Sequence, residues 1–208
     1  GTVPVEAALM GIHSVGVDAS PFCRFMAQTK VDALTMSLTR ARRALGNYEE
    51  VFEYFKGRIG KPLTGSKVRK LKPTEGSMAA MESAAEYVTA RDREGLNKED
   101  RDTSNTYNFL LLAYLDSAGY SERSKRKSPL EQFKAILERY LFVADKIQTV
   151  LKGVESELGT TRILEGDARD MALEDSSVEG IVFSPPYSFA VDYLANDSFH
   201  LNFLGIDA

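Results

Sequence analysis

The residues best suited to chemistry form one short run, Ser184-Pro185-Pro186-Tyr187, which follows the apolar residues 180–183. A serine hydroxyl and the next backbone carbonyl can both accept hydrogen bonds from an amine and orient it. Two consecutive prolines hold the carbonyls in an extended geometry without competing backbone donors. The tyrosine ring can stack on a planar group. The run is a candidate catalytic site, and the alternative is a strand ending in an ordinary Pro-Pro turn.

A second candidate is Asp18, which ends the apolar run of residues 14–17 and is followed by Ala19, Ser20 and Pro21. In nucleotide-binding α/β folds, an acid at the carboxyl end of a strand binds ribose hydroxyls. Pro21 suits the first turn of a new helix. The alternative interpretation is therefore that Asp18 or Ser20 caps that helix.

Two further turns have the residue types of a ligand-binding loop. Gly1 and Thr2 precede a predicted helix over residues 3–10, which Gly11 ends, and a glycine turn lets the backbone approach a ligand closely. Gly166-Asp167-Ala168 follows a short predicted strand over residues 161–164. The alternative for Asp167 is a solvated turn residue.

The order of these features resembles the S-adenosylmethionine-dependent amino-methyltransferases of DNA, whose catalytic tetrapeptide begins with Asp, Asn or Ser. The resemblance covers roughly the first thirty and the last fifty residues. It implies that the tetrapeptide binds the exocyclic amine of a flipped base, with Tyr187 stacked on that base. It also implies that S-adenosylmethionine is the cofactor and that Asp167 accepts from its adenine amine. The cofactor-binding residues implied are Gly1, Thr2, Asp18, Ala19, Asp167 and Ala168.

Serine at the first tetrapeptide position is familiar from cytosine amino-methylases of restriction-modification systems, so the resemblance favours cytosine and leaves adenine open. Two alternatives remain. An RNA base methyltransferase uses the same tetrapeptide chemistry. A truncated, non-catalytic methyltransferase-like core could instead bind protein or nucleic acid through its helical part.

The predicted fold is α/β: a partial class I methyltransferase (Rossmann-like) core with a large, mainly helical insertion. Residues 1–30 and 158–208 form the core, with strands over residues 14–17, 161–164 and 178–183. Residues 31–157 form the insertion, where apolar residues recur at helical spacing. The chain begins at Gly1 and stops soon after the tetrapeptide. We therefore expect it to be part of a longer protein and to lack some of the core strands.

Basic residues in the insertion are candidates for contact with nucleic-acid phosphates, with DNA favoured over RNA. The alternative is a solvated loop. The overall net charge of −4 excludes a uniformly basic surface but not a local basic groove. The candidates are Lys67, Arg69, Lys70 and Lys72.

Other classes of protein find no support in the sequence. A single cysteine, Cys23, excludes an internal disulfide and fits a cytoplasmic setting; its position on a predicted helix indicates packing rather than catalysis. His13 and His200 have no ligand-spaced partners, so we predict no metal site. No apolar run approaches the roughly 20 residues that span a bilayer, so we predict no membrane association. Association with another chain is compatible with the sequence.

Overall fold

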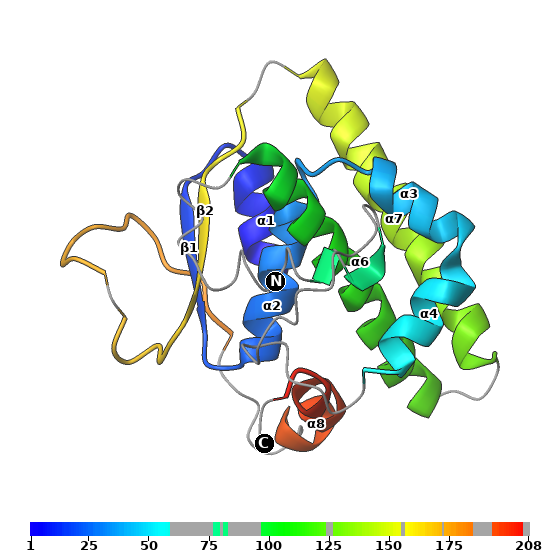
Figure 1. Ribbon diagram of the computed structural model, residues 1–208. Helices are drawn as coiled ribbons and strands as arrows, with labels where there is room; N and C mark the ends of the chain where they lie inside the picture. The colour runs from blue at the N-terminus through cyan, green and yellow to red at the C-terminus, as the bar shows by residue number, and fades with distance from the viewer. Residues whose placement is uncertain are drawn as a thin grey trace.

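A two-stranded parallel sheet lies at one side of the molecule, with helices against one of its faces and a larger group of helices beyond them (Figure 1). This arrangement comes from a computed structural model. Its secondary structure is α/β, as predicted. The residues that the structure describes are 1–58, 77–79, 81–82, 97–123, 127–154, 157–171, 173–184 and 193–205.

The sheet joins two segments far apart in the sequence. β1 (Ser14–Asp18) and β2 (Thr161–Glu165) run parallel, in a register that pairs Gly16 with Ile163. A side chain at Gly16 would meet Ile163 Cδ1 at 3.0 Å and Pro4 Cγ at 3.4 Å. Glycine at this position therefore lets the Ile163 side chain and the helix that contains Pro4 pack closely against β1. The strands predicted over residues 14–17 and 161–164 are confirmed.

Two helices pack against the sheet: α1 (Thr2–Leu9) and α2 (Pro21–Asp32) (Figure 1). α1 stops where Gly11 adopts a positive φ of 74°. Ser20 caps α2, because its Oγ accepts a hydrogen bond from the Cys23 N–H at 3.3 Å, and proline occupies the first turn. Both predicted helices are confirmed.

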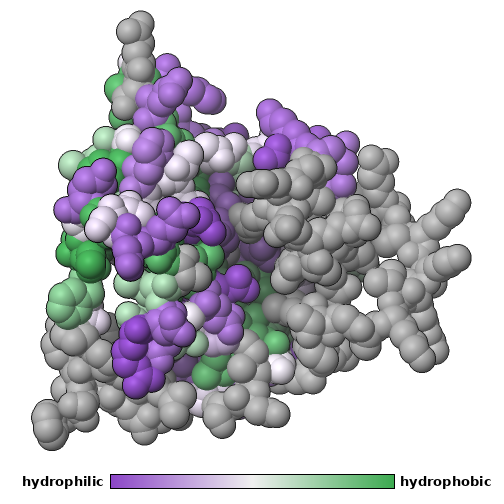
Figure 2. All heavy atoms as spheres, turned by 90° about the vertical axis from the view of Figure 1, so that its left-hand side faces the viewer, coloured by the Kyte–Doolittle hydropathy of each residue, from purple (hydrophilic) through white to green (hydrophobic). Residues whose placement is uncertain are grey.

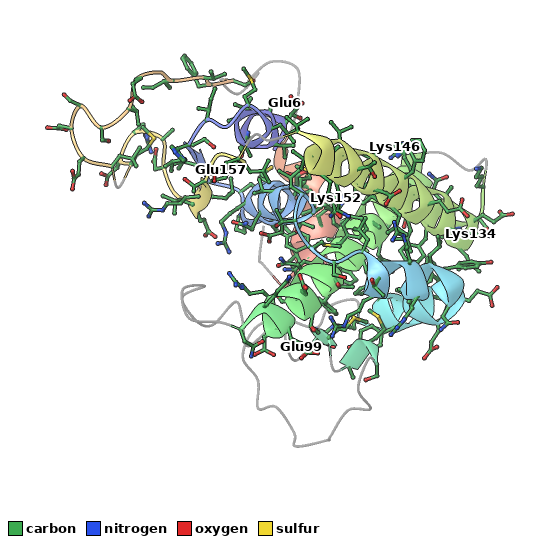
Figure 3. The ribbon with its side chains drawn as sticks, turned by 90° about the horizontal axis from the view of Figure 1, so that it is seen from above. Glu6, Glu99, Lys134, Lys146, Lys152 and Glu157 are labelled. Atoms are coloured by element: carbon green, nitrogen blue, oxygen red, sulfur yellow. The ribbon has the colours of Figure 1, made fainter. Side chains whose placement is uncertain are left out.

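The remaining helices form a separate group, with α6 (Lys98–Arg123) and α7 (Pro129–Gly153) as its longest members. Ser128 and Glu131 form a capping box at the start of α7. α3 (Thr39–Gly46) and α4 (Tyr48–Lys56) pack against this pair. Figure 3 shows Lys134, Lys146 and Lys152 spaced along α7.

Aromatic rings fill the centre of the helical group. Phe55 of α4, Tyr107 of α6 and Phe133 of α7 have no exposed surface. The last helix, α8 (Tyr193–Phe203), joins the cluster because Phe203 lies 5.4 Å from Tyr114, ring centre to ring centre. The main core therefore lies among the helices rather than on the sheet.

The strand predicted over residues 178–183 is wrong. These residues are irregular, and Ile181, Val182 and Phe183 are 70–78% exposed. A strand needs a neighbouring backbone to bond with, and the described sheet contains only β1 and β2. Figure 2 shows hydrophobic side chains interrupting the hydrophilic surface on the side of the molecule that this segment occupies. Apolar composition alone therefore did not produce the strand.

Several predictions fall outside the described residues. They include Pro185, Pro186 and Tyr187 of the tetrapeptide and the basic residues Lys67, Arg69, Lys70 and Lys72. Within the described part of the chain, no helix is both long and apolar enough to cross a membrane.

Truncation of Phe133 tests the aromatic core. Phe133→Ala is expected to lower the free energy of unfolding by about 3–5 kcal/mol, because a large side chain is lost from a closely packed site. Urea denaturation measures it. Phe142, also on α7, is 63% exposed and is the matched control. Phe142→Ala is expected to stay within roughly 0.5 kcal/mol of the wild type. Equal losses in both variants would contradict this description of the core.

Candidate functional site

The parallel pairing brings the carboxyl ends of β1 and β2 to one edge. Asp18 lies opposite Glu165, and the Gly166 N–H donates a hydrogen bond to the Asp18 carbonyl at 3.1 Å. Arg24 of α2 ion-pairs with Glu165 at 3.5 Å and ties that helix to the same edge. The turn containing Asp167 therefore begins beside Asp18, although the two residues are far apart in the sequence.

Asp18 leaves the end of β1 as an exposed residue, with exposed Ala19 after it. Its Oδ1 accepts a hydrogen bond from the Ser20 N–H at 2.8 Å, which shapes the turn into α2. The cap of α2 is Ser20, so capping does not occupy Asp18. The carboxylate is thus oriented by the turn and reachable from solvent.

Asp167 and Ala168 lie in the exposed turn after β2. Asp167 Oδ1 accepts hydrogen bonds from the backbone N–H and the Nε–H of Arg169, both at 2.9 Å. These bonds hold the pKa of Asp167 below its usual value and raise that of Arg169. Asp167 is therefore an ionised acceptor beside a cation.

Gly1 and Thr2 lie at the start of α1. A Cβ at Gly1 would lie 3.2 Å from the Ala27 Cα, so this end of α1 sits against the middle of α2.

Two residues at this edge were missed or set aside by the sequence analysis. Burial raises the pKa of Asp197 on α8, the charge of His200 lowers it, and the charge of Asp18 raises it. Burial raises the pKa of half-buried Cys23, and the charges of Asp18 and Asp197 raise it further. Asp197 had no sequence signal, because its place depends on how α8 packs. The structure therefore brings a helix that follows the tetrapeptide close to Asp18.

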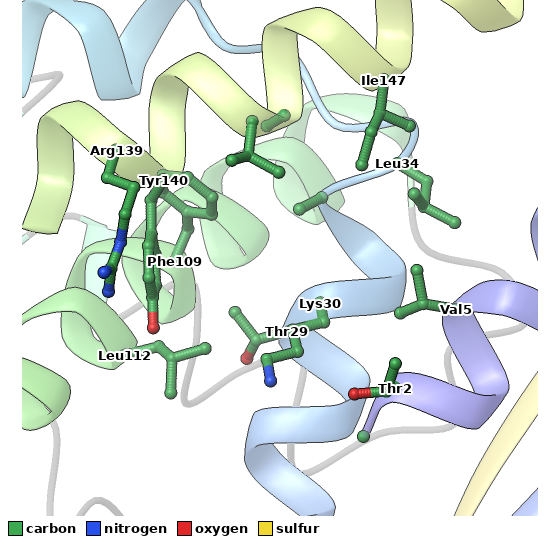
Figure 4. Close-up of a pocket in the computed structure, with 14 residues that line it drawn as sticks. Thr2, Val5, Thr29, Lys30, Leu34, Phe109, Leu112, Arg139, Tyr140 and Ile147 are labelled. Carbon is green, nitrogen blue, oxygen red and sulfur yellow. The ribbon is translucent and has the colours of Figure 1, made fainter.

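A cavity of about 280 Å³ lies between α1, α2, α6 and α7 (Figure 4). Thr2 and Val5 line it from α1, opposite Phe109 of α6 and Tyr140 of α7. Burial and the charge of Asp116, which accepts the tyrosine hydroxyl at 3.2 Å, raise the pKa of Tyr140. Thr2, the first residue of α1, thus faces this cavity.

Of the tetrapeptide, the structure describes Ser184, which is exposed and in irregular chain. The geometry of the tetrapeptide remains a prediction.

In the described part of the chain, no group of three or more His, Cys, Asp or Glu residues is arranged to hold a metal ion. His13 instead uses its Nδ1 to accept a hydrogen bond from the Thr160 N–H at 3.1 Å.

No protein-family model matches the chain. No solved structure matches it either. A curated protein that does match is the type II methyltransferase M.BsoBI of Geobacillus stearothermophilus, which is 21% identical over 244 residues. The match covers 100% of this chain and 46% of that protein, so the chain spans less than half the length of the relative. The chain is therefore a distant relative of a type II methyltransferase.

Proposed function

We propose that the chain carries the cofactor site and the target-binding tetrapeptide of a methyltransferase that modifies an exocyclic amine of a DNA base. The observation that carries the proposal is the shared carboxyl edge of β1 and β2, which places Asp18 next to the turn that contains Asp167. Ligands of parallel α/β sheets bind outside the carboxyl ends of the strands. The similarity to a type II methyltransferase supports the same conclusion.

The residues at this edge fit S-adenosylmethionine. Asp18 presents an exposed carboxylate, the acceptor that paired ribose hydroxyls require. Asp167 is an ionised acceptor for an adenine amine, and the guanidinium of Arg169 lies beside it. We assign Ala19 and Ala168 to the walls beside these acids, and Gly1 and Thr2 to the backbone that approaches the cofactor. When bound there, S-adenosylmethionine supplies an electrophilic methyl group.

The tetrapeptide would act on the amine itself. The lone pair of an exocyclic amine is delocalised into the base, which makes the nitrogen a poor nucleophile. The Ser184 hydroxyl and the Pro185 carbonyl accept the amine hydrogens and orient the lone pair. Pro186 keeps the backbone rigid, and Tyr187 stacks on the flipped base. The methylated amine loses one proton to solvent, because a serine hydroxyl and a peptide carbonyl accept the N–H hydrogen bond but are too weakly basic to keep the proton.

Serine at position 184 favours cytosine over adenine within this proposal. An RNA base remains an alternative target, and methylation assays on matched DNA and RNA substrates separate the two. We assign phosphate contacts to the basic residues Lys67, Arg69, Lys70 and Lys72.

A non-catalytic module is the alternative from another class of protein. Calorimetric titration of the intact protein decides that point, because a binding module without a cofactor site gives no heat with S-adenosylmethionine.

Tyr187→Ala tests the base-stacking role. Turnover on DNA is expected to fall with little change in cofactor affinity, because stacking on a base is worth about 1–3 kcal/mol. Radiolabelled methyl transfer measures the rate, and calorimetry measures the affinity. Tyr187→Phe keeps the ring and is the control, with a rate expected near that of the wild type. An unchanged rate in the alanine variant would remove the stacking role.

Asp18→Ala and Ser20→Ala separate cofactor binding from helix capping. Loss of Asp18 is expected to weaken S-adenosylmethionine binding by about 1–3 kcal/mol, because a charge-assisted acceptor disappears. Loss of Ser20 is expected to lower the free energy of unfolding by roughly 1 kcal/mol and leave affinity intact. Titration calorimetry and urea denaturation on both variants measure this. The assignment fails if Asp18→Ala binds the cofactor normally.

The 208 residues alone are expected to bind S-adenosylmethionine poorly and to transfer no methyl group. The described sheet has two strands, and the side chains of residues 181–183 lie exposed, so we propose that further strands complete it. Calorimetry and a methyl-transfer assay on this piece measure the two activities. Micromolar cofactor affinity together with DNA methylation would show that the sheet needs no further strands.

A further inference from the structure

His200 is a buried histidine that the proposed mechanism does not use. It lies on α8 and is 9% exposed. Its ring stacks on Phe22 of α2, with the ring centres 4.2 Å apart and the planes 4° from parallel. Its Nε2 lies 3.2 Å from the backbone carbonyl oxygen of Leu115 on α6. Because a carbonyl can only accept, His200 donates from Nε2. One side chain thus joins three helices.

The stacked partner of His200 belongs to the start of α2. Phe22 is the second residue of that helix and follows the Ser20 cap, whose own N–H is bound by Asp18. Asp197 lies one turn before His200 on α8, and its pKa responds to the charge of Asp18. In Figure 1, α8 sits at the end of α2 where β1 enters that helix. His200 therefore holds the part of α8 that contains Asp197 next to the first turn of α2.

We propose that His200 is a positioning residue for methyl transfer: it holds α8 against the first turn of α2, beside Asp18. This inference rests on the proposed function. Histidine combines a flat face for Phe22 with an edge donor for the Leu115 carbonyl. Phenylalanine supplies the first contact, and glutamine can supply a donor without the aromatic face.

Two substitutions in the intact protein test the two contacts. His200→Phe keeps a ring for Phe22 and removes the donor, whereas His200→Gln removes the ring. Both are expected to lower kcat for DNA methylation by about tenfold to a hundredfold, because small misplacements of reacting groups have effects of that size. The Kd for S-adenosylmethionine is expected to stay within about twofold, because Asp18 belongs to β1 rather than to α8.

Leu204→Ala is the matched control, because Leu204 is also buried and follows the last turn of α8. It is expected to lower the unfolding temperature while kcat per folded molecule stays unchanged. Amide hydrogen exchange gives a readout besides activity: α8 should exchange faster in both His200 variants, with exchange in α7 unaltered. Unchanged kcat in both His200 variants, or an equal loss in Leu204→Ala, would overturn the proposal.

The same experiment separates this inference from the proposed function. If the wild-type protein methylates no base, the proposed function fails, yet the hydrogen exchange of α8 still reports whether His200 holds the helix. If the wild type is active and α8 exchanges at the same rate in both His200 variants, the positioning role is wrong and the proposed function stands.

Discussion

The structure depends on one long-range contact, the parallel pairing of β1 with β2. The side chains of Ser14 and Thr161 meet at the start of the pair, 147 residues apart in the sequence. A one-residue slip would reverse which side chains face the helices, so the close fit of Gly16 against Ile163 and α1 opposes any other register. This register sets Asp18 beside the turn that contains Asp167.

The helices between the two strands make that pairing possible. α6 and α7 lie together and return the chain to the sheet, and aromatic rings hold them to α4. α2 is the link between the two layers, since it contacts the sheet on one side and α6 and α8 on the other (Figure 1). The strand ends beside Asp18 and Asp167 are thereby supported by a hydrophobic core that lies mainly among the helices.

Local signals predicted much of this architecture. Ser20 with Pro21, and Ser128 with Glu131, mark helix starts that the structure contains, because capping depends on a few adjacent residues. Residues 178–183 do not form the predicted strand, because a strand also requires a neighbouring strand with which it can hydrogen-bond. The positions of Asp197 and His200 could not be predicted, because they depend on how α8 packs against α2 and α6. The last three residues of the tetrapeptide and the four basic candidates lie outside the described residues, so their roles remain proposals: Pro185, Pro186, Tyr187, Lys67, Arg69, Lys70 and Lys72.

The most direct test of the central claim is a crystal structure of the intact protein with S-adenosylhomocysteine bound. The account predicts that a carboxylate oxygen of Asp18 lies about 2.6–3.2 Å from the ribose hydroxyls, with Asp167 near the adenine amine. A ligand bound away from the carboxyl ends of β1 and β2, with Asp18 contacting only its own turn, would contradict it.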